Sequence, residues 1–453
     1  MSKYKAYPEY KDSWVESLDN IPKMWSIKKL KYIFEIKKKI AGKIGYDVLS
    51  VTQKGIKIKD IESGEGQLSM DYSKYQRVYP GEFAMNHMDL LTGYVDISNY
   101  DGVTSPDYRV FAVRNKHSFY SRYYLYLLQD GYKQRRFFHL GQGSAHLGRW
   151  RLPTEAFNEI VYPCPSLKEQ IKIASFLDHE TAKIDNLIEK QQQLIELLKE
   201  KRQAVISHAV TKGLNPDVPM KDSGVEWLGE VPEHWELVPL KYLCNFSGGG
   251  TPTKDNLSYW QGGTVPWVSP KDMKSFWISE TQDYVTPKAV SESSTNYVEE
   301  GSLLMVVRSG ILQRNIPVAI NIVKITINQD MKALRFNERM KAHYAAYFIN
   351  GNVKSLLLEW TKEGATVESI EHEFLANGLI PVPPIDEQHS IIKRISDQMK
   401  RFESLEENAL TGIRLLQERR TALISAAVTG KIDVRDWVAP ETSESEVSQE
   451  ATA

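Results

Sequence analysis

The most constraining feature of this 453-residue chain is that it contains the same sequence blocks twice. Residues 12–32, DSWVESLDNIPKMWSIKKLKY, return as residues 222–242, DSGVEWLGEVPEHWELVPLKY, at an offset of 210. Residues 163–211 return as residues 381–429 without a gap, at an offset of 218. A repeat of this length is too long for a solenoid turn or a propeller blade. It predicts a duplicated domain with a duplicated connector.

Each copy of the second block has the signals of one long helix. Ser166 lies three residues before Glu169, which is a capping-box pattern, and in the second copy Asp386 can play the capping role after Pro383 and Pro384. No proline interrupts either helix, and Gly213 and Gly430 follow as C-terminal stops. Helices of about 40 residues would be about 60 Å long.

The apolar residues of both helices recur at the a and d spacing of a coiled coil. The first heptad position holds Leu177, Ile184, Leu198 and Val205 in one helix, and Ile395, Phe402, Ala409, Leu416 and Leu423 in the other. The second position holds Ile173, Leu187 and Leu194, widened by Ile188 and Ile195, and in the other helix Ile391 and Leu405. We expect an antiparallel pair. The alternative is two independent helices that each pack on their own domain.

The segments between the shared blocks differ in sequence but follow one plan. Residues 26–162 contain the β-type runs YDVLSVTQ, RVFAV and EIVYPCP and the helical stretch FYSRYYLYLLQDGYKQRRFFHL. Residues 236–380 contain the strands TVPWVSP, SLLMVV and PVAINIV and the helix AHYAAYFINGNVKSLLLEW. One mixed α/β fold, adapted to two different targets, is therefore expected.

The predicted fold class is α/β (α+β), with two mixed α/β domains joined by two long antiparallel coiled-coil helices in a pseudo-twofold internal repeat. The predicted boundaries are an N-terminal segment at 1–25, a first domain at 26–162, a first helix at 163–212, a linker at 213–235 that repeats the N-terminal segment, a second domain at 236–380, a second helix at 381–430 and an acidic, disordered tail at 431–453.

The formal net charge of −1 conceals one basic region. Residues 26–162 carry 21 Lys and Arg against 14 Asp and Glu, a charge of +7, whereas residues 236–380 carry 14 against 15. A protein that clamps DNA between two domains does not need a high overall charge. The chain has no apolar run that would span a membrane and no signal-like start, so we expect a cytoplasmic protein without membrane contact.

Polar residues at strand ends and in glycine-containing turns are the candidate DNA contacts. Such side chains can hydrogen-bond base edges in the major groove, and glycine allows close backbone approach. The candidates in the first domain are Gln53, Lys54, Asn86, His87, Ser105, Tyr108, Arg109, Gln142, Ser144 and Arg149. Those in the second are Gly249, Thr251, Thr253, Arg308, Ser309, Asn328 and Gln329. For each of them the alternative is a solvated loop residue. Arg135 and Arg136 form either a phosphate patch or a basic helix end.

The sequence contains no recognisable catalytic centre. It lacks a GxxxxGK[ST] phosphate loop, a GxGxxG turn, and the [DN]PP[YF] and FxGxG motifs of amino-methyltransferases. Pro106–Asp107 and Pro216–Asp217 are not followed by the acidic-x-Lys pattern of a nuclease centre. Cys164 and Cys244 lack the paired spacing of a zinc site. We predict a non-catalytic binding subunit with no metal site.

Taken together, the blocks resemble one family. The pattern PxP, then EQxxI, then a long helix ending LLxE[KR]RxA[VL]ISxAVT is similar to the conserved regions of specificity subunits of Type I restriction–modification enzymes. GGGTPTKDNLSYWQGGTVPWVSPKDM and LLMVVRSGIL…INQDMKAL resemble the target recognition domains of that family. The resemblance covers nearly the whole chain, except the first dozen residues and the acidic tail.

The resemblance implies that each domain binds half of a split DNA target and that the helices set the gap. It also implies as partners double-stranded DNA, two methyltransferase (modification) subunits and two restriction (translocase) subunits. S-adenosylmethionine, ATP and Mg²⁺ would then be bound by the partner subunits, and no cofactor by this chain.

Three alternatives stay open. The chain is a specificity subunit of a related multi-subunit methyltransferase or nuclease system, an enzyme with a methyltransferase of its own, or a scaffold whose helical pair joins two domains that do not bind DNA. Salt-sensitive binding of duplex DNA would separate the scaffold from the DNA-binding subunit.

Overall fold

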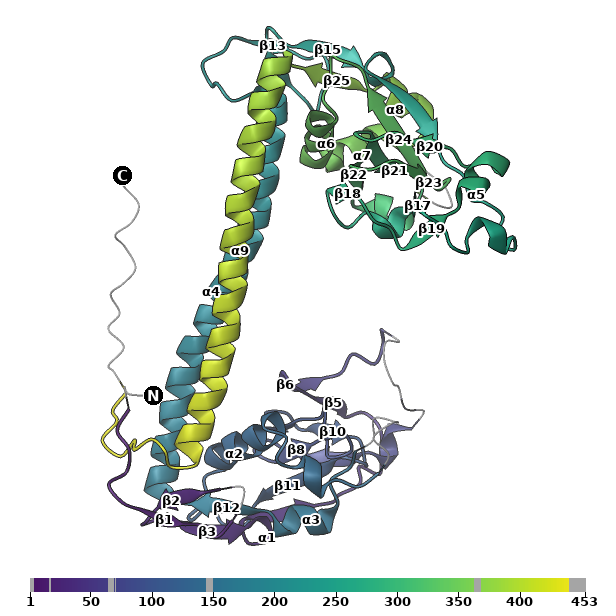
Figure 1. Ribbon diagram of the computed structural model, residues 1–453. Helices are drawn as coiled ribbons and strands as arrows, with labels where there is room; N and C mark the ends of the chain where they lie inside the picture. The colour runs from purple at the N-terminus through teal and green to yellow at the C-terminus, as the bar shows by residue number, and fades with distance from the viewer. Residues whose placement is uncertain are drawn as a thin grey trace. The chain divides into compact units, whose positions relative to one another are not determined.

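The computed structural model describes residues 4–15, 18–63, 69, 71–143, 150–361 and 368–439. The chain forms two compact units (Figure 1): residues 1–191 with 411–453, called unit 1, and residues 192–410, called unit 2. The candidates Ser144 and Arg149, and residues 440–453 of the predicted tail, lie outside the described residues. No helix in the described part of the chain is long and apolar enough to cross a membrane.

Unit 1 is built from two four-stranded sheets and the helices that cover them. Its elements are β1 (Tyr10–Asp12), β2 (Asn20–Pro22), β3 (Ser26–Lys29), α1 (Leu30–Ile33), β4 (Phe34–Lys37), β5 (Asp47–Thr52), β6 (Gly55–Ile58), η1 (Tyr72–Lys74), β7 (Gln76–Val78), β8 (Phe83–Met85), β9 (Val95–Ile97), β10 (Gly102–Thr104), β11 (Arg109–Val113), α2 (Ser121–Lys133), η2 (Phe138–Leu140), α3 (Thr154–Glu159) and β12 (Val161–Cys164). The sheet orders are β4–β11–β8–β9 and β6–β5–β10–β7, and β3 pairs with β12.

Unit 2 repeats this plan with different residues. Its elements are β13 (Met220–Asp222), β14 (Glu230–Pro232), β15 (Glu236–Pro239), η4 (Leu240–Tyr242), β16 (Cys244–Gly248), η5 (Leu257–Tyr259), β17 (Val265–Val268), η6 (Pro270–Asp272), β18 (Trp277–Ile278), β19 (Asp283–Val285), α5 (Pro287–Glu292), β20 (Tyr297–Val298), β21 (Leu303–Val306), η7 (Gly310–Gln313), β22 (Val318–Asn321), β23 (Ile325–Ile327), β24 (Met331–Phe336), α6 (Ala342–Gly351), α7 (Val353–Trp360), α8 (His372–Asn377) and β25 (Leu379–Val382). Its sheet orders are β16–β24–β21–β22–β18 and β19–β17–β23–β20, and β15 pairs with β25.

The two sheet topologies match strand for strand, except that the edge strand β18 of unit 2 has no counterpart in unit 1. β4, β11, β8 and β9 correspond to β16, β24, β21 and β22, and β6, β5, β10 and β7 correspond to β19, β17, β23 and β20. In each second sheet the central pair is parallel, β5 with β10 and β17 with β23, and its other pairs are antiparallel. The predicted pair of mixed α/β domains in an internal repeat is confirmed.

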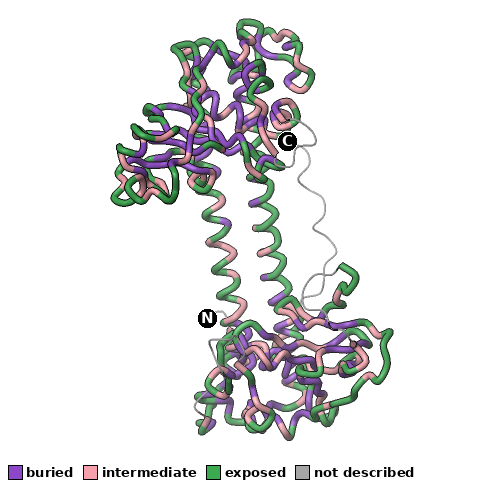
Figure 2. The backbone as a smooth tube through the Cα atoms, turned by 90° about the vertical axis from the view of Figure 1, so that its right-hand side faces the viewer, coloured by how far each residue is buried: buried purple, intermediate pink, exposed green. Residues whose placement is uncertain are grey.

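Residue alternation along the strands explains why the first sheet of each unit is buried on both faces. In β21, Leu303 and Met305 pack in the core that includes α6, whereas Leu304 and Val306 pack against β17 and β23 of the second sheet. In unit 1 Phe83 faces α2 and Ala84 faces the second sheet. Buried residues accordingly concentrate within the two units, and exposed and half-buried residues prevail along the middle of the long helices (Figure 2).

The two long helices, α4 (Leu167–Lys212) and α9 (Ile385–Val428), each contribute residues to both units. In unit 1 Arg420 of α9 donates hydrogen bonds of 2.8 and 3.2 Å to Asp185 of α4. In unit 2 Arg202 of α4 lies 3.8 Å from Glu403 of α9. From Asp185 to Arg202 the residue number rises along α4, whereas the residue number of the α9 partner falls from Arg420 to Glu403. The two helices are therefore antiparallel. The two ion pairs are repeat equivalents, because 185 + 218 = 403 and 202 + 218 = 420. These contacts exclude two independent helices.

The buried seam confirms the first predicted heptad position and corrects part of the second, of which Ile173 and Ile391 are buried as expected. Leu177, Ile184, Leu198, Ile395, Phe402, Ala409 and Leu423 are buried as expected. Leu187, Leu194 and Leu405, assigned to the second position, are 46%, 40% and 48% exposed. The residues one place later lie in the seam: Ile195 is buried, and Ile188 and Glu406 are half-buried. The sequence has three adjacent apolar columns, and a helix pair buries only the a and d columns.

Each domain is tied to the start of one long helix and to the end of the other. In unit 1 the Ser166–Glu169 capping box is formed, and Glu169 also accepts a 3.1 Å hydrogen bond from the Trp25 indole. The Trp235 indole donates a 3.1 Å hydrogen bond to Glu387 of α9 in unit 2. Tyr123 donates to the Val428 carbonyl of α9, and Tyr344 donates to the Val210 carbonyl of α4. The same anchoring is therefore used in both units.

Candidate nucleic-acid interface

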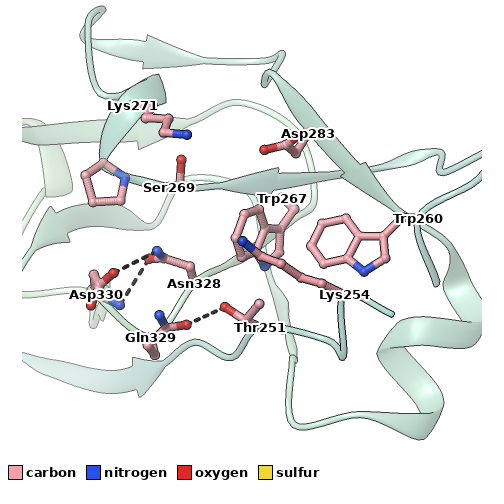
Figure 3. A pocket seen from close by; sticks show the side chains of 11 residues that line it. Thr251, Lys254, Trp260, Trp267, Ser269, Lys271, Asp283, Asn328, Gln329 and Asp330 are labelled. Carbon is pink, nitrogen blue, oxygen red and sulfur yellow. Dashed lines mark hydrogen bonds between the residues drawn. The ribbon is translucent and has the colours of Figure 1, made fainter. Parts of the chain in front are cut away.

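In unit 2, loops that follow several strands surround a depression of about 630 Å³, shown in Figure 3. Thr251 comes from the loop after β16, Trp267 from β17, and Asn328, Gln329 and Asp330 from the turn between β23 and β24. The other lining residues are Lys254, Trp260, Ser269, Pro270, Lys271 and Asp283. The predicted candidates Thr251, Asn328 and Gln329 are thus brought together.

Two tryptophans form the aromatic wall of this depression. The rings of Trp260 and Trp267 meet edge to face, with centroids 5.2 Å apart. Trp267 donates its indole N–H to the Gly250 carbonyl at 3.0 Å, and Trp260 donates to the Thr253 carbonyl at 3.2 Å. Both rings are therefore held in fixed orientations. The predicted candidate Thr253 contributes its backbone carbonyl, which accepts the hydrogen bond from Trp260.

The opposite wall is a hydrogen-bonded polar cluster. The Thr251 hydroxyl bonds to Gln329. Asn328 donates to the Asp330 carboxylate at 3.2 Å, and Asp330 accepts a further 2.8 Å hydrogen bond from Nε of Arg308. The Arg308 guanidinium, which is exposed, is in this way held beside the depression at the end of β21. Amide and guanidinium groups fixed at one rim are the groups that bond base edges.

The glycine run before Thr251 serves a close approach within the protein. A Cβ on Gly249 would lie 2.1 Å from the Ile327 carbonyl oxygen, and one on Gly250 would lie 2.5 Å from Oγ of Ser294. The close approach that these glycines allow is therefore made to β23 and to the loop that contains Ser294, within the protein itself.

Unit 1 has a depression of about 690 Å³ that shares two locations with the depression of unit 2. β5 corresponds to β17 and the β10–β11 turn to the β23–β24 turn, whereas the loop after β8 lines the depression in unit 1 and the loop after β16 lines it in unit 2. Its lining residues are Val48, Leu49, Ser50, Lys59, Ser69, Tyr72, Tyr75, Asn86, Met88, Asp89, Ser105, Pro106, Asp107 and Tyr108. It includes the predicted candidates Asn86, Ser105 and Tyr108, and its aromatic lining residues are tyrosines instead of tryptophans.

The β10–β11 turn of unit 1 is fixed by hydrogen bonds from a buried side chain. The Gln76 side chain, which is buried, donates hydrogen bonds of 2.7 Å to the Ser105 carbonyl and 2.6 Å to the Tyr108 carbonyl. Asn86 accepts from the Met88 backbone N–H at 3.3 Å. Burial raises the pKa of Tyr108, so its hydroxyl stays protonated and can donate a hydrogen bond.

Two predicted contacts, Arg109 and His87, are interior residues that line neither depression. Arg109 is 3% exposed, lies 4.5 Å over the Phe157 ring and donates to the Leu152 carbonyl at 3.0 Å. Burial lowers its pKa to about 10. His87 is 6% exposed, and burial, with the nearby Arg109 and Arg151, lowers its pKa to about 3. Neither side chain reaches the surface, and we assign both a role in packing.

His87 should make unit 1 sensitive to acid. Its folded pKa lies below the unfolded value, so the unfolded chain binds the proton first and stability is lost as pH falls below about 6.5. We expect a loss that approaches about 1.4 kcal/mol per pH unit between pH 6 and pH 4. His87→Gln should remove this part of the dependence. Urea titrations of both proteins at pH 7 and pH 5 measure the free energy of unfolding. The same loss of stability between the two pH values in both proteins would contradict the prediction.

The remaining candidates lie apart from the depressions. Gln53 and Lys54 occupy the exposed β5–β6 turn and line a different groove of unit 1, beside α2 and α4. Gln142 is exposed and pairs with the backbone of Arg151. Ser309 caps η7 next to Arg308. Arg136 pairs with Asp130 at 3.1 Å and donates to Ser425 of α9, which favours a structural role over a phosphate patch.

Apart from Tyr108, sequence reasoning missed the aromatic and lysine residues of both depressions. Lys254, Trp260, Trp267 and Lys271 fall within the stretch TPTKDNLSYWQGGTVPWVSPKD, in which aromatic and basic residues alternate with turn residues. Such interleaving is typical of nucleic-acid-binding surfaces, and it was the available signal.

A sequence model of the family described as "Type I restriction modification DNA specificity domain" matches residues 22–197 and 232–413, which is most of the chain and both repeats. The chain belongs to this family. The specificity domain is matched twice, once in each half of the sequence.

Curated relatives of this specificity-domain protein are specificity subunits of Type I restriction enzymes. The chain is 31% identical over 275 residues to the EcoR124I/EcoR124II specificity subunit of Escherichia coli, covering 59% of this chain and 61% of that subunit. It is 24% identical over 436 residues to the putative MjaX specificity subunit of Methanocaldococcus jannaschii, covering 92% and 96%.

Solved structures share the fold. The HsdS subunit from Thermoanaerobacter tengcongensis matches with a TM-score of 0.54 and 14% identity, over 91% of this chain and 98% of that one. A chain from a structural study of complex assembly and conformational transition in the Type I restriction–modification system matches with a TM-score of 0.64 and 14% identity, over 91% and 99%. The fold of this specificity-domain protein is therefore that of known specificity subunits.

Proposed function

We propose that this chain is the non-catalytic DNA-recognition subunit of a Type I restriction–modification complex, in which each unit binds one half of a bipartite target through the major groove. The observation that supports it most is the pair of depressions. Both units form one beside the equivalent strands β5 and β17 and the equivalent β10–β11 and β23–β24 turns, and both line it with aromatic, amide and lysine side chains, but the individual residues differ. One fold with two different linings is what two different half-sites require.

The long helices serve two further roles in this proposal. Because each is continuous through both units, their length sets the gap between the half-sites. Their repeated surfaces recruit two methyltransferase subunits, which carry S-adenosylmethionine and modify adenine, and two restriction subunits, which carry ATP and Mg²⁺. The residues of this chain position these partners on the DNA.

Mapping methylated adenines in the host genome with and without this chain tests the proposal directly. We expect a split motif that disappears when the chain is deleted. Purified chain should bind that motif with an affinity that falls steeply with salt. Binding that is insensitive to both salt and sequence would instead support the scaffold that does not bind DNA.

Gln329→Ala should relax specificity in one half-site only. Gln329 lies at the rim of the unit 2 depression, and a bidentate amide contact is worth about 1–3 kcal/mol of discrimination. We expect the discrimination between the correct base and its competitors to fall about 5- to 150-fold at one position of the target. Gln313→Ala, an exposed glutamine of the same unit outside the depression, is the control. Equal weakening on every sequence would identify a phosphate contact instead.

A further inference from the structure

The block 12–32 and its copy 222–242 have a visible structural use for most of their shared residues. Leu18, Pro22, Trp25 and Leu30, and their equivalents Leu228, Pro232, Trp235 and Leu240, are all buried. The side chains of Asp12 and Asp222 each accept a hydrogen bond from the backbone N–H two residues later. Packing and turn formation explain why these residues are the same in both copies.

Tyr32 and Tyr242 are also shared by the two copies, but neither packing nor turn formation explains them. Their side chains are 60% and 62% exposed, although both are large and aromatic. In each unit the ring neighbour is the preceding lysine, with Nζ of Lys31 5.4 Å and Nζ of Lys241 5.2 Å from the ring centroid. Neither hydroxyl has a hydrogen-bond partner within the described ranges. We call each pair, Lys31–Tyr32 and Lys241–Tyr242, a Lys–Tyr knob.

The protein holds both knobs rigidly and in the same way. The Leu30 N–H donates to the Ile160 carbonyl at 2.8 Å, and the Leu240 N–H donates to the Gly378 carbonyl at 3.0 Å. These carbonyls are repeat equivalents, since 160 + 218 = 378. Each buried leucine therefore fixes the backbone that displays the adjacent tyrosine to solvent.

The lysines are anchored by equivalent neighbours of different charge. Lys31 lies 2.6 Å from Glu159, and Lys241 donates a 2.7 Å hydrogen bond to Asn377, where 159 + 218 = 377. Lys29 shares Glu159 with Lys31, so one carboxylate faces two ammonium groups. Both knobs consequently keep a net positive charge beside the exposed ring.

We propose that each Lys–Tyr knob is the docking point for one copy of the same partner protein, the methyltransferase subunit. This rests on the proposed function. The two DNA-facing depressions differ, whereas the knobs are the same, and one surface displayed twice fits two identical partners. The partner face must offer an apolar hollow for the ring, rimmed by carboxylates for the lysine. Rigid exposed tyrosines are typical centres of such interfaces.

The test is to count partners on the full chain. The chain and the methyltransferase subunit of the same system are mixed, and the complexes are resolved by native mass spectrometry and sedimentation. Wild type should bind two copies. Tyr32→Ala and Tyr242→Ala should each bind one copy tightly and the other at least about 30-fold more weakly, a hot-spot effect. The double variant should bind neither tightly.

Tyr297→Ala is the matched control. Tyr297 is also exposed, at 40%, and Lys324 lies 4.7 Å from its ring centroid, but this pair occurs in unit 2 alone. It should bind two copies. Knob variants that behave like this control would overturn the inference while leaving the proposed function intact. Knob variants that lose DNA affinity but keep two partners would also overturn it. If wild-type chain binds no methyltransferase subunit, the proposed function itself fails.

Discussion

Removing one heptad from each long helix, residues 189–195 of α4 and 410–416 of α9, should abolish tight binding of the original DNA target. The deletions lie opposite one another between the ion pairs Asp185–Arg420 and Arg202–Glu403, and they keep the a/d pattern in phase. Seven residues shorten a helix by about 10 Å, which is about 3 base pairs of B-DNA and about a third of a turn. The two half-sites can then no longer be bound together.

Loss of simultaneous binding removes the gain from linking two modules, so affinity for the original target should fall about 10²- to 10⁴-fold. Methylation mapping should recover both half-sites with a different gap. Deleting residues 189–195 alone serves as the control, because it breaks the register of the pair and should destabilise the fold. An unchanged gap after the paired deletion would rule out the spacer role.

Trp235→Ala should unfold unit 2 far more readily than any substitution on its surface. The indole is fully buried, bonds Glu387 at the start of α9 and packs beside Gly213 at the end of α4. Removing such a ring leaves a cavity and typically costs about 3–5 kcal/mol. Trp25→Ala is expected to have the same effect on unit 1, through Glu169 and Gly430.

Chemical denaturation followed by fluorescence measures both variants. Trp277→Ala, in which the ring is 46% exposed, controls for the loss of an indole and should change stability by less than about 1 kcal/mol. DNA binding adds a second measure: Trp235→Ala should spare recognition of the half-site bound by unit 1. Equal loss of both half-sites would show that the units do not fold separately.

The repeat and the element types were predictable because they depend on local pattern. YDVLSVTQ, RVFAV and SLLMVV became β5, β11 and β21. Gly213 and Gly430, predicted as helix stops, both have φ of +78°, which glycine adopts without strain. The stretch AHYAAYFINGNVKSLLLEW forms two helices instead of one, with the break at Gly351 and Asn352, residue types that commonly end a helix. At the break Asn352 accepts a 2.9 Å hydrogen bond from the Ser207 hydroxyl of α4, which is 145 residues away in the sequence.

The candidate site was predictable in position but not in composition. Strand ends identified Asn86, Arg308 and Asn328, and topology then brought Asn328 together with Thr251. Arg109 follows the same local rule, yet Phe157 and Leu152 bury it, and these lie more than 40 residues further along the chain. The hydropathy of a residue does not reveal which distant backbone will cover it.

In unit 1 a segment near the start of the sequence meets the segment that follows α9. The Asp433 N–H donates to the Lys5 carbonyl at 2.8 Å, and the Tyr10 hydroxyl donates to the Gly430 carbonyl at 3.0 Å. In unit 2 the same place is crossed by continuous chain, from Gly213 into β13. A hydrogen-bonded seam thus closes one unit where a covalent linker closes the other. A gene opened at the linker and joined across these hydrogen-bonded segments would encode a circular permutant. It would contain the same elements in a different order along the chain.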